Sequence, residues 1–145
     1  MKSSMNNQAI SPLLMQVMFQ AKHRIFQIGE RHDLTFMQLN VLTKLSKGEP
    51  VAMNVLSHHF MCDASNITGI ADRLESRGLT ERLDHPKDRR IKMIGLTEAG
   101  IKLRDEILVE TFEAETAVME PVLTPDERIT LVELLGKIAA VGKKS

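Results

Sequence analysis

The sequence predicts a mainly α-helical protein with one small β-hairpin. Apolar residues recur at spacings of three and four along most of the chain, which is the period of a helix that buries one face. The pattern changes only over residues 79–96, where two strand-like runs flank a charged turn. The length of 145 residues suits a single domain, residues 1–145, and no apolar run approaches the ~18 residues of a membrane-spanning helix.

The first two helices are predicted from the residues that cap them. Ser11-Pro12 supplies a cap and a first helical residue, and the apolar period that follows weakens at Gly29. The second helix begins at Thr35, because Thr35 and Gln38 have the spacing of a capping box. Its apolar residues are Leu39, Leu42 and Leu45.

Two shorter helices follow. The third is expected from about residue 51 to residue 60. Its inward-facing residues are expected to be Val55, Leu56 and Phe60. The fourth begins at Asp63, which acts as the N-cap, and ends at Gly78, which suits a C-terminal cap. Its apolar stripe comprises Ile67, Ile70, Ala71 and Leu74.

The hairpin and two long helices complete the chain. The strand-like runs cover residues 79–84 and 90–96, and residues 85–89 form the turn between them. Thr97 then caps a long helix. The last helix begins at Thr124-Pro125-Asp126-Glu127, which combines a cap, a proline at the first position and a glutamate at the third.

This order of elements predicts a winged helix-turn-helix. Two short helices around a tight turn, followed by a hairpin, form that unit, here over about residues 34–100. The flanking segments, residues 8–32 and 101–143, carry more apolar surface than a thin monomer can cover. We therefore expect these segments to form the dimerisation region of a homodimer.

The fourth helix carries polar residues opposite its apolar stripe. Short hydroxyl and amide side chains in its first turns, with an arginine two turns later, suit a helix that lies in the major groove of DNA. The candidate contacts on this helix are Ser65, Asn66, Thr68, Gly69 and Arg73. The alternative is a solvated polar face without a partner.

The charged turn of the hairpin favours DNA binding. Long cationic side chains at the tip of a hairpin reach into a minor groove or along phosphates. Asp88 lies two residues before Arg90 and is placed to pair with it and hold its direction. The alternative is a solvated run of charges, but its position after a helix-turn-helix favours DNA. The candidate contacts here are Lys87, Asp88, Arg89, Arg90 and Lys92.

The net charge of the chain is zero, with 19 basic and 19 acidic residues, and this total conceals an uneven distribution. Residues 98–133 carry 3 basic and 10 acidic side chains, whereas residues 82–92 carry 5 basic and 2 acidic ones. A local basic patch attracts phosphate whatever the total charge. Neutrality therefore does not exclude DNA as a partner.

Three segments together resemble the MarR family of winged helix-turn-helix transcription regulators. They are Asp88-x-Arg90-x5-Leu96-Thr97-x-x-Gly100, Leu34-Thr35-x-x-Gln38-x-x-Val41-Leu42-x-x-Leu45, and Ile67-Thr68 followed by Asp72-Arg73-Leu74-Glu75 and Arg77-Gly78-Leu79. The resemblance implies a homodimer on a palindromic operator, and repression relieved by a small molecule or an oxidant. It also implies that Arg90 enters the minor groove, oriented by Asp88. The family often has a basic residue after the threonine, where this chain has Gly69.

Other classes of function find less support in the sequence. We expect no enzyme, cofactor or metal site, because there is no glycine-rich phosphate loop and no nucleophile–base pair. Cys62, near His58 and His59, leaves open a redox- or metal-responsive regulator, although a lone cysteine at this position is more often a packing residue. A winged-helix scaffold that binds protein instead of DNA is the other alternative. The single cysteine and the lack of a signal peptide predict a cytoplasmic location, away from the membrane.

Overall fold

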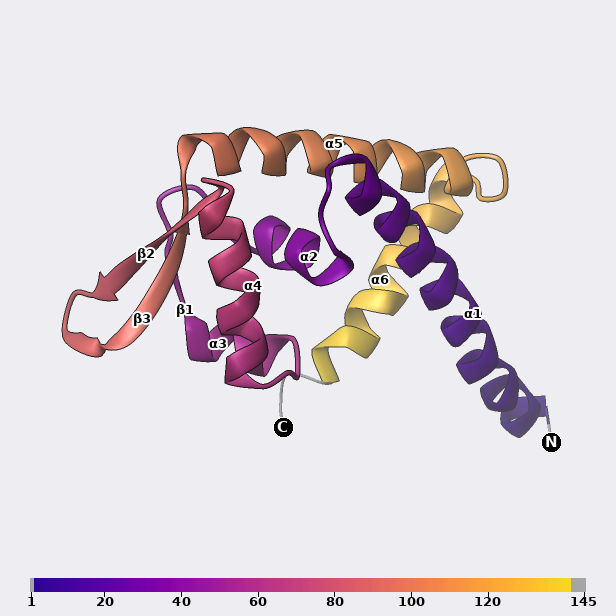
Figure 1. Ribbon diagram of the computed structural model, residues 1–145. Coiled ribbons are helices and arrows are strands. Elements are labelled where there is room, and N and C mark those ends of the chain that lie inside the picture. The colour runs from indigo at the N-terminus through magenta and orange to yellow at the C-terminus, as the bar shows by residue number, and fades with distance from the viewer. Residues whose placement is uncertain (1, 142–145) are drawn as a thin grey trace. The chain divides into compact units, whose positions relative to one another are not determined.

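The computed structural model describes residues 2–141 and confirms a mainly helical fold with a small antiparallel sheet (Figure 1). The elements in chain order are α1 (Lys2–Arg31), α2 (Phe36–Lys44), β1 (Val51–Ala52), α3 (Met53–His59), α4 (Ala64–Ser76), β2 (Thr80–His85), β3 (Asp88–Leu96), α5 (Glu98–Met119) and α6 (Pro125–Val141). The chain divides within α5 into two compact units, Met1–Thr111 and Phe112–Ser145.

The first unit encloses an apolar core that holds the helix-turn-helix together. Helices α2 and α3 both pack on α4, and β2 packs against α4 as well. The buried apolar residues are Ile28, Leu34, Leu39, Val41, Leu42, Leu45, Leu56, Ile67, Ile70, Ala71, Leu74, Leu79, Ile94 and Ile107. All four residues of the stripe predicted for α4 are among them, so its opposite, polar face is left to solvent.

The sheet has three strands in the order β1–β3–β2, all antiparallel. Val51 of β1 pairs with Ile94, and Ala52 pairs with Met93, so the prediction that the third helix begins at residue 51 was wrong. The backbone of this dipeptide bonds to the free edge of β3 instead of forming the first turn of a helix. The hairpin turn is also shorter than predicted, because β2 runs to His85 and β3 begins at Asp88.

Two further expectations were wrong. Helix α1 passes through Pro12, so Ser11-Pro12 is not its start. A proline inside a helix removes one backbone donor and crowds the carbonyl four residues before it, yet the helix continues on both sides of Pro12. Val55 lies on the solvent side of α3 with 54% of its surface exposed, because Leu56 is the residue of this short helix that enters the core.

The predicted caps are largely confirmed. Thr35 and Gln38 exchange side-chain and backbone hydrogen bonds of 3.2 and 2.9 Å, which is a complete capping box. Thr124 and Glu127 do the same at the start of α6. Asp63 takes the N-cap position of α4, but its side chain makes no capping hydrogen bond.

Several helices in the structure carry apolar side chains that nothing in their own unit covers. In the first unit, every residue of α1 from position 8 to position 20 is exposed. In the second unit, α6 has no buried residue. None of the helices in the described part of the chain combines the length and apolar character needed to cross a lipid bilayer.

Candidate nucleic-acid interface

The exposed face of α4 carries all five residues predicted on this helix. Ser65, Asn66, Thr68, Gly69 and Arg73 are exposed, while Ile67 and Ile70 between them are buried. The Thr68 hydroxyl donates to the carbonyl of Ala64 at 2.9 Å, which fixes its direction and leaves its oxygen free to accept a further bond. This face therefore offers hydroxyl, amide and guanidinium groups at a protein surface.

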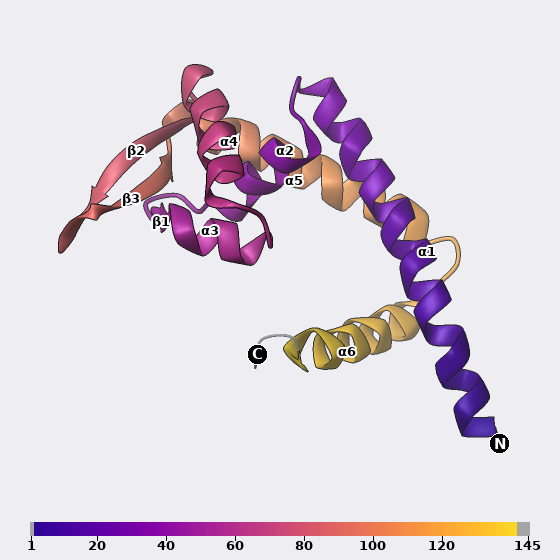
Figure 2. The same ribbon diagram turned by 60° about the horizontal axis from the view of Figure 1, so that its bottom comes forward.

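The β2–β3 hairpin extends away from the helices of the first unit in both ribbon views (Figures 1 and 2). Near its tip, Arg90 donates from Nε and Nη2 to the two carboxylate oxygens of Asp88, each at 3.0 Å. The backbone N–H of Arg90 also donates to Asp88 at 3.0 Å. The predicted pairing of these two residues is confirmed, and it is a two-point contact that fixes the plane of the guanidinium.

The Asp88–Arg90 pair keeps both charges while remaining accessible. The hydrogen bonds from the Arg90 side chain, and then from its backbone, lower the pKa of Asp88 from its ordinary value. The same contact raises the pKa of Arg90. The hydrogen bonds to Asp88 hold the Arg90 guanidinium in one direction. Because the side chain is 90% exposed, the guanidinium is still open to a partner.

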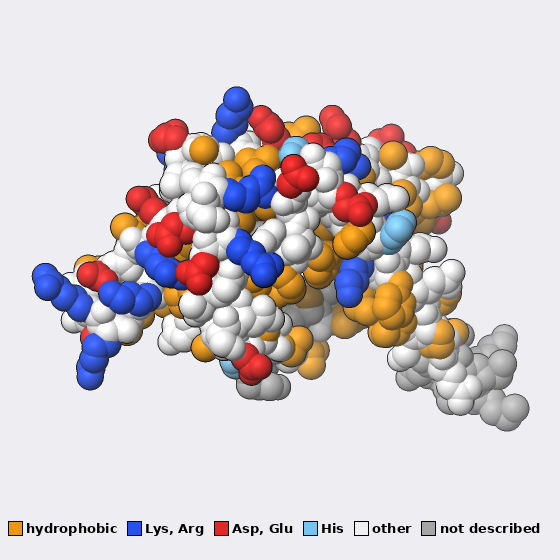
Figure 3. All heavy atoms as spheres, viewed as in Figure 1, with side chains coloured by type: hydrophobic (Ala, Val, Ile, Leu, Met, Phe, Trp, Pro, Cys, Tyr) orange, Lys and Arg blue, Asp and Glu red, His pale blue; other side chains and the backbone are white. Residues whose placement is uncertain are grey.

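The other cationic residues predicted on the hairpin differ in whether an acidic residue of the hairpin pairs with them. Lys87 and Arg89 are exposed at the tip, and Figure 3 shows cationic side chains gathered over this end of the molecule. Lys92 lies opposite Asp84 in the strand register, and its Nζ donates to the Asp84 carboxylate at 2.6 Å. The charge of Lys92 is therefore partly balanced within the hairpin.

Arg82 has a role that the sequence pattern alone did not reveal. Its guanidinium contacts the carboxylate of Asp72 on α4 and lies 3.8 Å from a carboxylate oxygen of Glu75. Its backbone N–H donates to Glu75 at 3.3 Å. Arg82 thus connects the first strand of the hairpin to α4. The signal present in the sequence was a pair of acids three residues apart on the polar side of α4.

The exposed face of α4 and the hairpin border the same hollow, which has a volume of about 300 Å³. Its lining comes from the starts of α3 and α4 and from β3: Met53, Asn54, Ala64, Thr68, Arg90, Ile91 and Lys92. Thr68 of α4 and Arg90 of the hairpin therefore border the same surface depression. Asn54, which is exposed at the start of α3, was not predicted as a site residue and borders it too.

The segment Leu96-Thr97-x-x-Gly100 joins the hairpin to α5 through close backbone contacts. The Thr97 hydroxyl donates to the carbonyl of Gly78 at 2.6 Å and accepts from the N–H of Gly100 at 3.0 Å. A Cβ atom on Gly100 would lie 1.8 Å from the carbonyl oxygen of Leu79, so only glycine fits there. These contacts fix the end of α4 and the start of β2 against the first turn of α5.

Cys62 lies outside this surface. Its side chain is half-buried after α3, and its backbone N–H donates to Ser57 at 3.0 Å. Among residues 2–141 no group of three His, Cys, Asp or Glu side chains is arranged to hold a metal ion.

Comparison with known proteins agrees with this geometry. The model of the MarR family matches residues 34–92, which span the helix-turn-helix and most of the hairpin. The chain belongs to the MarR family. It is 29% identical over 140 residues to the transcriptional repressor MdtR of Bacillus subtilis (strain 168), covering 96% of this chain and 90% of that protein. It is 30% identical over 109 residues to the transcriptional regulator FarR of Neisseria gonorrhoeae, covering 75% and 74%.

Solved structures of the family share its fold. CouR from Rhodococcus jostii RHA1, crystallised with p-coumaroyl-CoA, superposes with a TM-score of 0.73 at 28% identity, over 90% of this chain and 91% of CouR. The winged helix-turn-helix predicted from the order of elements is confirmed by this likeness. The protein is thus a MarR-family transcriptional regulator, and its named relatives are regulators as well.

Proposed function

We propose that this regulator is a repressor that binds a palindromic DNA operator as a homodimer and releases it when a small molecule binds. Helix α4 enters the major groove through Ser65, Asn66, Thr68 and Arg73, and the hairpin tip reaches the adjacent minor groove. Gly69 lies on the same face in open space, since nothing in the chain lies within 4 Å of where its Cβ would be.

The Asp88–Arg90 pair is the observation that carries this proposal. A fixed and exposed guanidinium beyond the end of a helix-turn-helix suits insertion into a narrow, strongly negative minor groove. Lys87 and Arg89 flank it as phosphate contacts. Thr68 and Arg90 border one hollow, which supports a single DNA surface made from α4 and the hairpin.

The uncovered apolar helices support the homodimer. Exposed apolar residues run along α1 and α6. We assign residues 8–32 and 101–143 to the dimer interface and 34–100 to the DNA-reading lobe; residues 142 and 143 of that range lie outside the part of the chain that the structure describes. A two-fold dimer presents two copies of α4 to half-sites about 34 Å apart, one turn of the DNA helix. A palindromic operator follows from that symmetry.

The small-molecule part of the proposal rests on the family. CouR was crystallised with a coenzyme A thioester, so a relative with this fold holds a small organic ligand. A ligand that rotates the DNA-reading lobes changes the distance between the two copies of α4, and the operator is then released.

Salt-dependent binding to duplex DNA tests the proposal against a winged-helix scaffold that binds protein. The probe is the duplex that the wild-type protein enriches from a randomised pool, and affinity is measured by fluorescence anisotropy over a series of salt concentrations. We expect affinity to fall steeply with salt, because phosphate contacts release counterions, and Arg90→Ala to weaken binding by about tenfold or more. If no duplex is enriched, the protein is not a DNA reader; unchanged affinity in Arg90→Ala would refute the role of the hairpin.

A further inference from the structure

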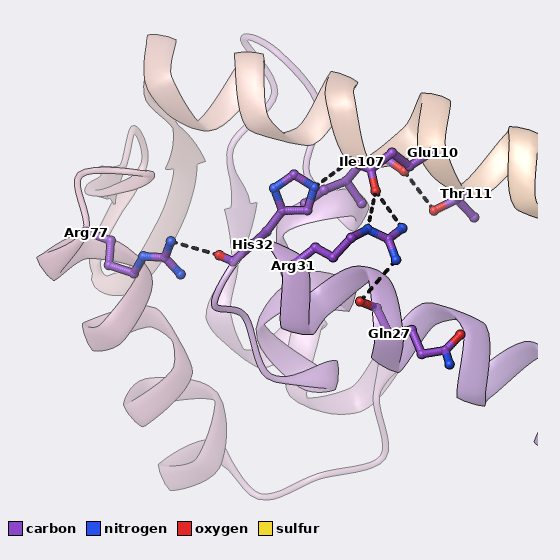
Figure 4. A network of polar contacts seen from close by, with 7 residues as sticks. All are labelled: Gln27, Arg31, His32, Arg77, Ile107, Glu110 and Thr111. Atoms are coloured by element: carbon purple, nitrogen blue, oxygen red, sulfur yellow. Dashed lines mark hydrogen bonds and ion pairs between the residues drawn. The ribbon is translucent and has the colours of Figure 1, made fainter.

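The turn between α1 and α2 is held by side chains from two other helices of the first unit (Figure 4). Five residues take part: Arg31 and His32 at the end of α1, Asp33 in the turn, Arg77 at the end of α4, and Glu110 on α5. We call this group the junction cluster. None of its members lies on the proposed DNA surface.

On the α5 side, one carboxylate binds two neighbouring side chains. Arg31 donates from Nε and Nη2 to Oε2 of Glu110 at 3.2 and 2.8 Å. His32 Nε2 lies 2.6 Å from the other oxygen, Oε1. The contact with Arg31, followed by that with His32, lowers the pKa of Glu110 from its ordinary value. Both oxygens of Glu110 are thus occupied by consecutive residues of the turn.

On the α4 side, one guanidinium binds two consecutive carbonyl groups. Arg77 is the C-cap residue of α4, and it donates from Nη1 to the carbonyl of Asp33 at 2.7 Å and from Nη2 to that of His32 at 3.0 Å. A planar, two-point contact fixes orientation as well as distance, which a single ammonium group cannot do. The end of α4 is therefore bonded to the backbone of the same turn.

The turn itself has little room to adjust. Asp33 has a φ of 54°, in the left-handed region that residues other than glycine seldom adopt. A Cβ on Gly29 would lie 2.6 Å from the carbonyl oxygen of Leu34, and the Leu34 N–H donates back to Gly29 at 2.9 Å. Because the turn is so closely packed, a displacement of His32 moves the carbonyl that Arg77 binds.

We propose that Arg77 is a positioning residue for operator binding, acting through the His32–Asp33 backbone, with Glu110 as the anchor on α5. Apolar packing against α2 holds α4 in place but has little directionality. The two hydrogen bonds of Arg77 add a directional link between the end of α4 and the α1–α2 turn, beside the Thr97 contact that joins this end to α5. This inference rests on the proposed function, because the orientation of α4 matters only if α4 reads DNA.

A spacing series separates positioning from simple stability. The probes are the duplex enriched by the wild-type protein and versions with one or two base pairs inserted or removed at its centre. The wild-type protein should discriminate sharply between spacings. We expect Arg77→Ala to bind the native spacing about tenfold more weakly, as for the loss of two hydrogen bonds, and to discriminate less between spacings. Arg77→Lys, which keeps the charge but not the two-point contact, should also lose spacing preference.

The coupling through the turn has its own readout. Arg77 and Glu110 share no contact in the structure, so independent effects on operator affinity would add. If the cluster acts as a unit, Arg77→Ala combined with Glu110→Gln should weaken binding no more than the stronger single change. Additive effects would refute the coupling.

Arg90→Ala is the control that separates the two proposals. If Arg90→Ala weakens binding while Arg77→Ala and Arg77→Lys keep the wild-type affinity and spacing preference, the inference about Arg77 is wrong and the proposed function stands. If the wild-type protein enriches no duplex, both are wrong. A uniform loss of affinity in the Arg77 variants, with the spacing preference unchanged, also overturns the positioning role.

Discussion

Helices α4 and α6 carry similar apolar residues but differ in what covers them. In α4, Ile67, Ile70, Ala71 and Leu74 are all at most 7% exposed, because the first unit packs around them. In α6 Leu131 is half-buried, and the exposed fraction of the other large apolar residues runs from 43% for Leu135 to 72% for Val141. The first helix belongs to a core that its own unit completes, whereas the second has an apolar surface without cover.

This difference separates the two tasks of the protein. In our proposal α4 reads DNA and needs a fixed position, which its core residues on one face provide while the opposite face stays exposed. The apolar side chains of α6 are each worth about 1.5–3 kcal/mol if buried. That gain is available only through a partner, which in our proposal is a second copy of the chain.

The largest effect should come from a charge placed on α6. We expect Ile138→Asp to dissociate the dimer, since an uncompensated buried charge costs about 3–5 kcal/mol. The same change costs little in the separated chain, because Ile138 is 55% exposed there. Light scattering over a range of protein concentrations measures the mass. Ala140→Asp, on the opposite face of the helix, is the matched control, and a wild-type protein that is monomeric would refute the comparison.

The second largest effect should come from shortening a buried side chain of α4. Leu74 is fully buried, so Leu74→Ala should lower the free energy of unfolding by about 2–5 kcal/mol. Because this core is complete within one chain, the loss should be the same in the Ile138→Asp background. Urea denaturation of both single variants and the double variant provides the measurement. A cost that disappears in the Ile138→Asp background would mean that the second copy is needed to bury α4.

A smaller gain is expected on the open face of α4. Gly69→Lys should raise the free energy of unfolding by about 0.5–1 kcal/mol, since an exposed glycine weakens a helix, and nothing obstructs the new side chain. It should also strengthen DNA binding and steepen the salt dependence by about one phosphate contact. Gly69→Gln is the control: it should give the gain in stability without the steeper salt dependence. Equal binding by the two variants would place position 69 away from the phosphates.

The smallest effect concerns pH. Because the pKa of Glu110 is lowered in the folded protein, its carboxylate stabilises the fold above the ordinary value of 4.5, and this contribution disappears as pH falls through the lowered value. The difference in free energy of unfolding between wild type and Glu110→Gln should therefore shrink from about pH 5 downward. Thermal unfolding at a series of acidic pH values measures it. A difference that grows on acidification would contradict the assigned contacts.

The features that could be predicted from sequence are those set by neighbours along the chain. The Thr35–Gln38 capping box, the apolar stripe of α4 and the Asp88–Arg90 pair all depend on residues at most four positions apart or on a single helical period. A short spacing leaves few conformations open, so the residue types alone identify these structures.

What escaped prediction depends on partners far along the chain. Val51 forms a strand because β3, more than forty residues later, offers a free edge. The contacts of Arg82 with Asp72, and of Arg77 with the α1–α2 turn, likewise depend on the packed fold. The acids of α4 marked a possible partner for a cation, but only the packed fold shows which cation it is. The contacts of Arg82 and Arg77 link α4 to the hairpin and to the α1–α2 turn.

The Asp88–Arg90 pair also has a consequence for the entropy of binding. A free arginine side chain samples many rotamers and loses them when it enters a groove. In this hairpin much of that freedom is already lost in the unbound protein, because two hydrogen bonds to Asp88 restrain the guanidinium of Arg90. Asp88 keeps its negative charge, since its pKa is lowered, and in the proposed complex this charge disfavours phosphates that approach in the wrong alignment. The pair should therefore favour a correctly docked groove over the many random sites along a chromosome.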